Sequence, residues 1–166
     1  MSERGRASRF IGIDPGTTRV GYGVVEAVGG SLRFVAAGIV PVKSPARAGR
    51  LVEIHRGLLR LLDEHRPKAM SIEQLFFSTN QKTAIAVAEA RGVLLLAAAE
   101  RAVALTELSP REVKFGIAGY GGADKRAVLK MVRLILHEPA LRVIDDASDA
   151  LALAILVSHR PPKGLV

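Results

Sequence analysis

The stretch from Phe10 to Val25 constrains the fold more than any other part of the chain. It reads Phe-Ile-Gly-Ile-Asp-Pro-Gly-Thr-Thr-Arg-Val-Gly-Tyr-Gly-Val-Val. The apolar run before Asp14 has the length of a buried strand, and the Pro-Gly pair after it favours a type II turn. A second β-rich run, Val20 to Val25, follows at once, so we expect a hairpin with Asp14 at the tip of its first strand. An Asp before Pro-Gly can also be a simple turn former, and this stretch alone leaves both roles open.

The composition is that of a basic, globular protein without cysteine. The chain has 166 residues, of which 49% are hydrophobic, and a formal net charge of +8. The lack of cysteine excludes disulfides and zinc-thiolate sites and is compatible with a reducing cytoplasm, where we expect the protein to act. The polar start and the absence of any membrane-length apolar run predict neither a secretory signal nor a membrane partner. The positive charge favours a polyanionic partner, nucleic acid before membrane, although a solvated basic surface is the simpler alternative.

Hydrophobic periodicity predicts strands and helices along the rest of the chain. The expected strands after the hairpin are 32–42, 69–73 and 103–108, and the expected helices are 50–65, 79–101, a short one opened by Pro110, 124–136 and 146–158. This order predicts an α/β fold of mixed α+β character, with a five-stranded sheet that starts as an antiparallel meander, continues with parallel strands and is flanked by helices. Residues 1–8 read as a flexible basic tail, 9–160 as a single domain and 161–166 as a C-terminal tail.

Four acidic residues lie at positions where this layout brings chain segments together. Glu73 ends an apolar run much as Asp14 does, and Asp146 and Asp149 are three residues apart at the start of the last helix. Each of the last two can be explained by the preference of carboxylates for helix N-termini. Together, the four would repel one another unless divalent cations were bound, and oxygen ligands select Mg²⁺ or Mn²⁺. Two such ions about 4 Å apart promote phosphodiester hydrolysis. By spacing, Asp145 could take the place of Asp146.

Basic and aromatic side chains supply candidate nucleic-acid contacts. A glycine-rich break at 119–122 is flanked by four basic residues, Arg111, Lys114, Lys125 and Arg126. These could follow a phosphate backbone, and a solvated charged face is the alternative for each of them. Phe76 and Phe77 directly follow the expected Glu73 strand, where they could stack on an unpaired base or pack into the core. The four histidines lie on or near helix C-termini and are expected to be structural.

Several of these motifs together resemble the bacterial RuvC Holliday junction resolvases. They are Ile-Gly-Ile-Asp-Pro-Gly-Thr-Thr-Arg-Val-Gly-Tyr-Gly-Val-Val, Ile-Glu-Gln-Leu-Phe-Phe, Ala-Arg-Gly-Val, Arg-Glu-Val-Lys and Asp-Ala-Ser-Asp-Ala-Leu-Ala-Leu-Ala-Ile, in the family's order over residues 9–160. The resemblance implies a ribonuclease-H-like fold and a metal-dependent endonuclease, active in recombination and DNA repair, that makes paired symmetric nicks in a four-way junction and leaves 5′-phosphate ends. It assigns the catalytic and metal-binding roles to Asp14, Glu73, Asp146 and Asp149.

The resemblance also implies further roles and partners. Phe76 would match an aromatic residue that intrudes at the junction centre, whereas Phe77 lies where the family varies. Lys114 and Lys125 would match basic residues near the scissile phosphate. The resemblance implies a homodimer, which the two-fold symmetry of a junction also favours, and a partnership with the RuvAB branch-migration motor. The apolar helix at 79–101 is the expected dimer interface.

Three other functions remain possible from the sequence. The Gly-Ile-Asp-Pro-Gly-Thr-Thr run also resembles the first phosphate loop of actin- and chaperone-like ATPases, although those proteins need two such lobes. A non-catalytic junction-binding module would tolerate loss of a carboxylate, whereas all four are present. An RNA-processing nuclease of the same fold would differ in its substrate.

Overall fold

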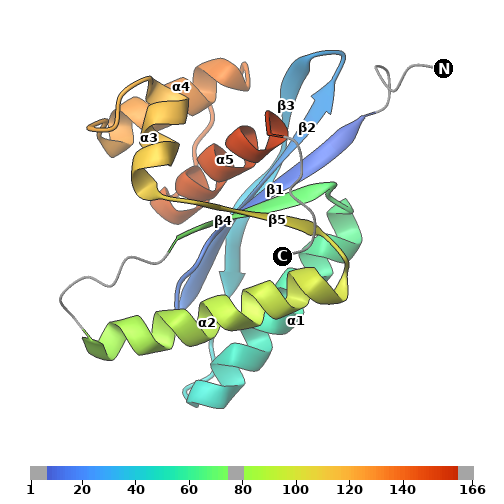
Figure 1. Ribbon diagram of the computed structural model, residues 1–166, viewed down its shortest axis with the longest axis vertical. Helices are drawn as coiled ribbons and strands as arrows, with labels where there is room; N and C mark the ends of the chain where they lie inside the picture. Colours follow the sequence, from blue (N-terminus) through green and yellow to red (C-terminus); the bar gives the residue numbers. More distant parts are fainter. Residues whose placement is uncertain (1–6, 75–80, 161–166) are drawn as a thin grey trace.

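One mixed β-sheet forms the centre of the molecule (Figure 1). The computed structural model describes residues 7–74 and 81–160. The strand order is β3-β2-β1-β4-β5. The strands are β1 (Ser8–Asp14), β2 (Arg19–Val28), β3 (Ser31–Pro41), β4 (Ala69–Glu73) and β5 (Ala104–Leu108). Antiparallel pairing joins β1, β2 and β3, and parallel pairing joins β1, β4 and β5, so the predicted meander followed by parallel strands is confirmed.

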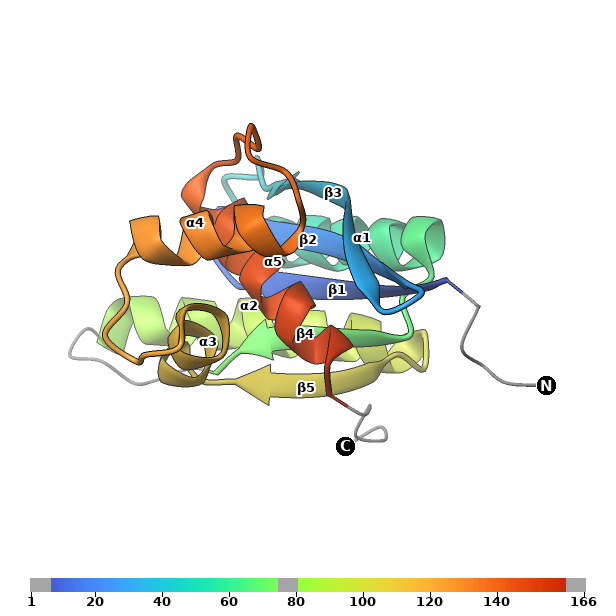
Figure 2. The same ribbon diagram turned by 90° about the horizontal axis from the view of Figure 1, so that it is seen from above.

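Helices cover both faces of the sheet and give a three-layer arrangement (Figure 2). They are α1 (Arg47–His65), α2 (Gln81–Glu100), α3 (Pro110–Ala118), α4 (Lys125–Ile135) and α5 (Asp145–Ser158). Helices α1 and α2 pack on one face around Ile11, Leu58 and Leu94, while α3, α4 and α5 pack on the other around Phe10, Val132 and Leu151. Alternate residues of β1 thus supply both cores, as expected for a central strand.

Local sequence explains where the helices begin and end. Helix α1 ends where Arg66 takes a left-handed conformation just before Pro67, which cannot continue a helix. Helix α3 begins with a capping box, because the Ser109 hydroxyl accepts from the Glu112 amide and the Glu112 carboxylate accepts from the Ser109 amide. This cap sets the orientation of α3, which carries Lys114.

Helix α5 crosses β1 and β2 at unusually close range. A Cβ atom at Gly12 would overlap the carbonyl oxygen of Ala150, and one at Gly23 would lie 2.6 Å from the amide nitrogen of Leu151. Gly21, in the same strand as Gly23, would overlap the carbonyl group of Asp146 in the same way. The glycines therefore let the backbone of α5 rest directly on the two strands, and this contact holds the start of α5 beside the end of β1.

Within the part of the chain that the structure describes, no helix is both long and apolar enough to cross a membrane.

Candidate active site

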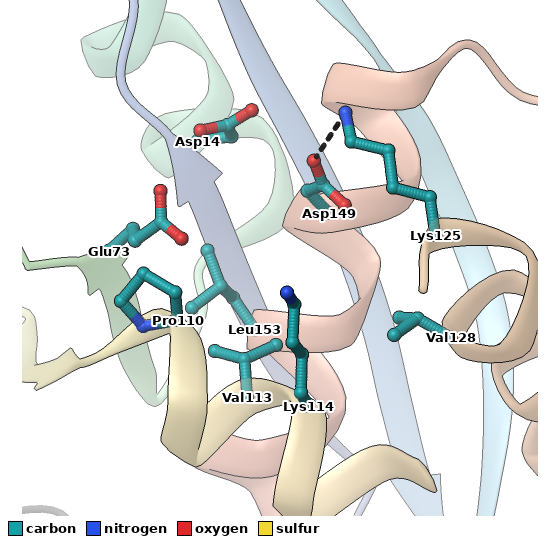
Figure 3. A pocket seen from close by; sticks show the side chains of 9 residues that line it. All are labelled: Asp14, Glu73, Pro110, Val113, Lys114, Lys125, Val128, Asp149 and Leu153. Atoms are coloured by element: carbon teal, nitrogen blue, oxygen red, sulfur yellow. Dashed lines mark ion pairs between the residues drawn. The ribbon is translucent and has the colours of Figure 1, made fainter. Parts of the chain in front are cut away.

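Three of the predicted carboxylates surround one cavity at the carboxyl ends of the central parallel strands (Figure 3). Asp14 ends β1, Glu73 ends β4, and Asp149 lies one turn into α5. Because β1 and β4 are paired in parallel, their ends meet at the same edge of the sheet. The cavity measures about 240 Å³ and is closed on its other side by α3 and α4.

The carboxyl groups of this cavity hold protons more tightly than isolated ones. Burial, followed by the charges of Glu73, Asp149 and Asp146, raises the pKa of Asp14 to about 7. Burial is also the main cause that raises the pKa of Glu73 and that of Asp149. Desolvation and mutual repulsion both disfavour the charged form of an acid, so this cavity would gain stability from a bound cation.

Two lysines face the carboxylates (Figure 3). The Nζ atom of Lys125, at the start of α4, lies 3.6 Å from Asp149 and 3.5 Å from Asp145. The charge of Asp149 is the largest cause that raises the pKa of Lys125. Lys114 reaches the cavity from α3, and its charge acts against the rise in the pKa of Glu73.

Asp145 and Asp146 point in different directions although they are adjacent. Asp145 is largely exposed and faces Lys125, outside the cavity. The carboxylate of Asp146 lies 3.4 Å from the guanidinium of Arg19 and lines a neighbouring hollow, yet its charge still reaches Asp14. The charge of Asp146 thus acts on both Asp14 and Asp149, whereas that of Asp145 acts, among the carboxylates of the cavity, only on Asp149, which makes Asp146 the better candidate for a fourth acidic residue.

The donor atoms suit a hard divalent cation, although they do not form a closed ligand set. Carboxylate oxygens are the ligands that Mg²⁺ and Mn²⁺ prefer, and the raised pKa of Asp14 marks an excess of negative charge. Among the described residues, however, no three His, Asp or Glu side chains lie close enough together to hold an ion as they stand. Asp14, Glu73, Asp146 and Asp149 are the residues that would bind the metal.

The remaining predicted contacts lie around the cavity or outside the described residues. Arg111 is exposed in the first turn of α3, next to Gly121, and Arg126 is exposed at the start of α4; neither lines the cavity. Phe76 and Phe77 fall in the segment 75–80, outside the described residues. The histidines lie away from the cavity, and His55 pairs with Glu100 across α1 and α2.

Sequence reasoning did not identify two contributors to the site. Arg19 pairs with Asp146. Only its position just after Asp14 in the sequence could have indicated that it lies near the site. The glycines that contact α5 determine how closely Asp149 approaches Asp14. The spacing of Gly21 and Gly23, which places both on one face of β2, could have indicated this close contact.

Comparison with known proteins reveals the family. The family model described as crossover junction endodeoxyribonuclease RuvC matches residues 10–159. This chain belongs to the RuvC family. The RuvC protein of Roseiflexus sp. is 46% identical over 157 residues, which cover 94% of each chain. The RuvC protein of Thermomicrobium roseum is 46% identical and covers 89% of this chain and 90% of its own length.

Solved RuvC structures match the fold as well. The Thermus thermophilus RuvC in complex with its Holliday junction substrate has a TM-score of 0.83 and 36% identity, and the match covers 89% of this chain and 91% of that one. The yeast mitochondrial Holliday junction resolvase Ydc2 shares the fold at 17% identity, with a TM-score of 0.65 and coverage of 92% and 78%. The predicted ribonuclease-H-like fold is thus confirmed.

Proposed function

We propose that this protein is a divalent-metal-dependent endonuclease that resolves Holliday junctions by paired symmetric nicks during recombination and DNA repair. The observation that carries the proposal is the cavity where Asp14, Glu73 and Asp149 meet opposite Lys114 and Lys125, in a chain of the RuvC family. A related RuvC protein is described in complex with a Holliday junction. As part of this proposal, the protein acts in the cytoplasm, where bacterial DNA lies.

Four carboxylates take the metal-binding roles in this proposal. Asp14 and Glu73 end adjacent strands and would anchor the metal, and Asp149 and Asp146 would complete its ligands from α5. When bound, Mg²⁺ or Mn²⁺, in two sites, supplies the polarisation of the phosphodiester and the activation of water for hydrolysis. A cleaved bond leaves a 5′-phosphate and a 3′-hydroxyl that a ligase can join.

The basic residues take the DNA-binding roles. Lys114 and Lys125 reach the same cavity as the carboxylates and would offset the charge of the phosphate during hydrolysis. Arg111 and Arg126 lie beside them on α3 and α4, where they would contact the backbone of the DNA. Phe76 and Phe77 would stack on or wedge between bases at the junction centre.

Two partnerships belong to the same proposal. A homodimer presents two equivalent cavities to a two-fold symmetric junction, and α2 would supply its interface. Ile85 and Leu96 of α2 are 59% and 53% exposed, and a second copy placed on α2 would remove this apolar surface from water. Family membership further supports delivery of the substrate by the RuvAB branch-migration complex.

Cleavage of a labelled four-way DNA junction tests the proposal. Wild-type protein should nick opposed strands with Mg²⁺ or Mn²⁺, should leave a linear duplex and an RNA junction of the same sequence intact, and should be inactive with a chelator. Asp14→Asn should abolish cleavage, whereas Asp63→Asn, which alters an exposed carboxylate paired with Arg101, should retain it. Tight junction binding without cleavage under either metal, or preferred cleavage of RNA, would overturn the proposal.

A further inference from the structure

A second hollow lies at the turn that directly follows Asp14. Its volume is about 410 Å³, and it lies between the turn that follows β1 and the first turns of α2. Thr17, Thr18 and Arg19 line it from the turn, Thr83 lines it from α2, and Asp146 lines it from α5. None of the basic residues predicted to contact DNA borders this hollow, so it is separate from the surface that Lys114 and Lys125 form.

Arg19 is the basic group of this hollow, and the carboxylate of Asp146 offsets its charge. Among the described residues that line it, Arg19 is the only basic one, and its side chain is 67% exposed. Its partner is the carboxylate of Asp146 at 3.4 Å. An ion pair as exposed as this one contributes little to stability, so a second anion can replace Asp146 at the guanidinium at a small cost in free energy.

The other lining groups suit a phosphate as well. The hydroxyl groups of Thr17 and Thr18 can donate hydrogen bonds, and they are carried by the same short turn as Arg19. A guanidinium and hydroxyl donors together form a common phosphate-binding set, because arginine can contact two phosphate oxygens at once. The wall opposite the turn is made of the small or apolar residues Ala86 and Val87, which add no negative charge.

Asp146 connects the hollow to the active site. It lines the hollow, and its charge also contributes to the raised pKa of Asp14 across the site. The turn that lines the hollow directly follows Asp14, the last residue of β1, so the hollow begins at the same end of that strand as the active-site cavity. A backbone phosphate next to the reacting phosphodiester is therefore the substrate anion that we assign to Arg19.

We propose that the hollow binds a backbone phosphate of the nucleic-acid substrate, next to the bond that is cut, with Arg19 as its main ligand. This inference rests on the proposed function, because it concerns the substrate of the same site. Asp146 competes with the phosphate for Arg19, so binding of the phosphate is strongest when a divalent cation neutralises the carboxylates.

The affinity of a fluorescent four-way junction tests the inference. Binding is measured by anisotropy with saturating Ca²⁺ over a series of salt concentrations, for wild type, Arg19→Gln, Arg19→Lys and Arg33→Gln. Arg33 is a matched control, because it is an exposed arginine at the opposite end of the β2–β3 hairpin from Arg19. Circular dichroism melting of each variant establishes that it is folded.

The expected result is roughly tenfold weaker binding for Arg19→Gln, with a salt slope smaller by about one. Arg19→Lys should keep the salt slope, because it keeps the charge, but should recover only part of the affinity, because it cannot contact two phosphate oxygens at once. Arg33→Gln should bind within about twofold of wild type. Equal, small effects of Arg19→Gln and Arg33→Gln would overturn the inference while leaving the proposed function intact. Failure of wild-type protein to prefer the junction over a duplex would overturn the proposed function and the inference with it.

Discussion

Asp14 is partly buried and lies close to other carboxylates, and in the absence of a bound metal both features disfavour its charged form. It ends the central strand β1, where burial and three neighbouring carboxylates raise its pKa to about 7. Its ordinary pKa is 3.8, so the folded protein holds this proton more tightly than the unfolded chain does. The folded state is therefore penalised increasingly as the pH rises from about 4 to 7, and the penalty stays constant above that range.

Removing the charge of Asp14 should stabilise the metal-free protein at high pH. We expect Asp14→Asn to raise the free energy of unfolding at pH 8 by on the order of 2 kcal/mol, and to leave it nearly unchanged at pH 4. Thermal melting in the presence of a chelator, followed by circular dichroism at both pH values, measures this difference. A variant that is less stable than wild type at pH 8 would contradict the electrostatic account of the cavity.

The two adjacent carboxylates at the start of α5 should differ in their effect on cleavage. Asp145 faces Lys125 in an exposed ion pair, which contributes little, so Asp145→Asn should keep the cleavage rate within about threefold of wild type. Asp146→Asn should lower the rate by on the order of 100-fold, because Asp146 is a proposed metal ligand. Single-turnover cleavage of a junction measures both, and the reverse order of effects would assign the metal-binding role to Asp145.

Among the elements, the contact between β1 and α5 sets the geometry of the site. Asp14 belongs to the strand and Asp149 to the helix, and glycines allow the two backbones to touch. A methyl group at Gly12 would push α5 outward and would move Asp149 away from Asp14.

Gly12→Ala should therefore damage both stability and activity. We expect a loss of at least about 2 kcal/mol in unfolding free energy and a large fall in junction cleavage, because the added carbon overlaps backbone atoms that cannot move separately. Gly122→Ala is the matched control, since a Cβ atom there meets nothing within 4 Å. Urea unfolding measures the loss of stability, and a junction-cleavage assay measures the loss of activity. If Gly12→Ala and Gly122→Ala gave the same unfolding free energy and cleavage rate, α5 could shift without loss of either.

The sequence predicted the strands, and the position of Asp14 and Glu73 at strand ends, because both leave local signals. Hydrophobic periodicity and the Pro-Gly turn identified the strands that end on Asp14 and Glu73, and parallel pairing then brought these residues together. The pairing of Arg19 with Asp146 had no such signal, because it joins residues far apart in the chain through side-chain orientation. The choice between Asp145 and Asp146 likewise depended on the rotation of α5, which the glycines of β1 and β2 determine.

At the scale of the whole molecule, the apolar surface of α2 predicts self-association. We expect Leu96→Glu to weaken dimer formation by at least about tenfold, because it places a charge in the proposed interface. Val52→Glu changes an exposed apolar residue of α1 and should leave the dimer intact. Sedimentation velocity over a range of concentrations measures both variants, and a wild-type protein that stays monomeric throughout would contradict the proposed interface.

The close contact of α5 with the sheet also determines which positions of the sequence can be substituted during evolution. The distance from Asp14 to Asp149 depends on main-chain atoms resting on glycines, and the packing of α1 and α2 lies on the other side of the sheet. Substitutions that repack the α1–α2 layer can therefore accumulate while the catalytic spacing is retained. The same contact leaves almost no freedom to vary Gly12, Gly21 and Gly23, so we expect these three positions to tolerate fewer substitutions than the buried side chains of the α1–α2 layer.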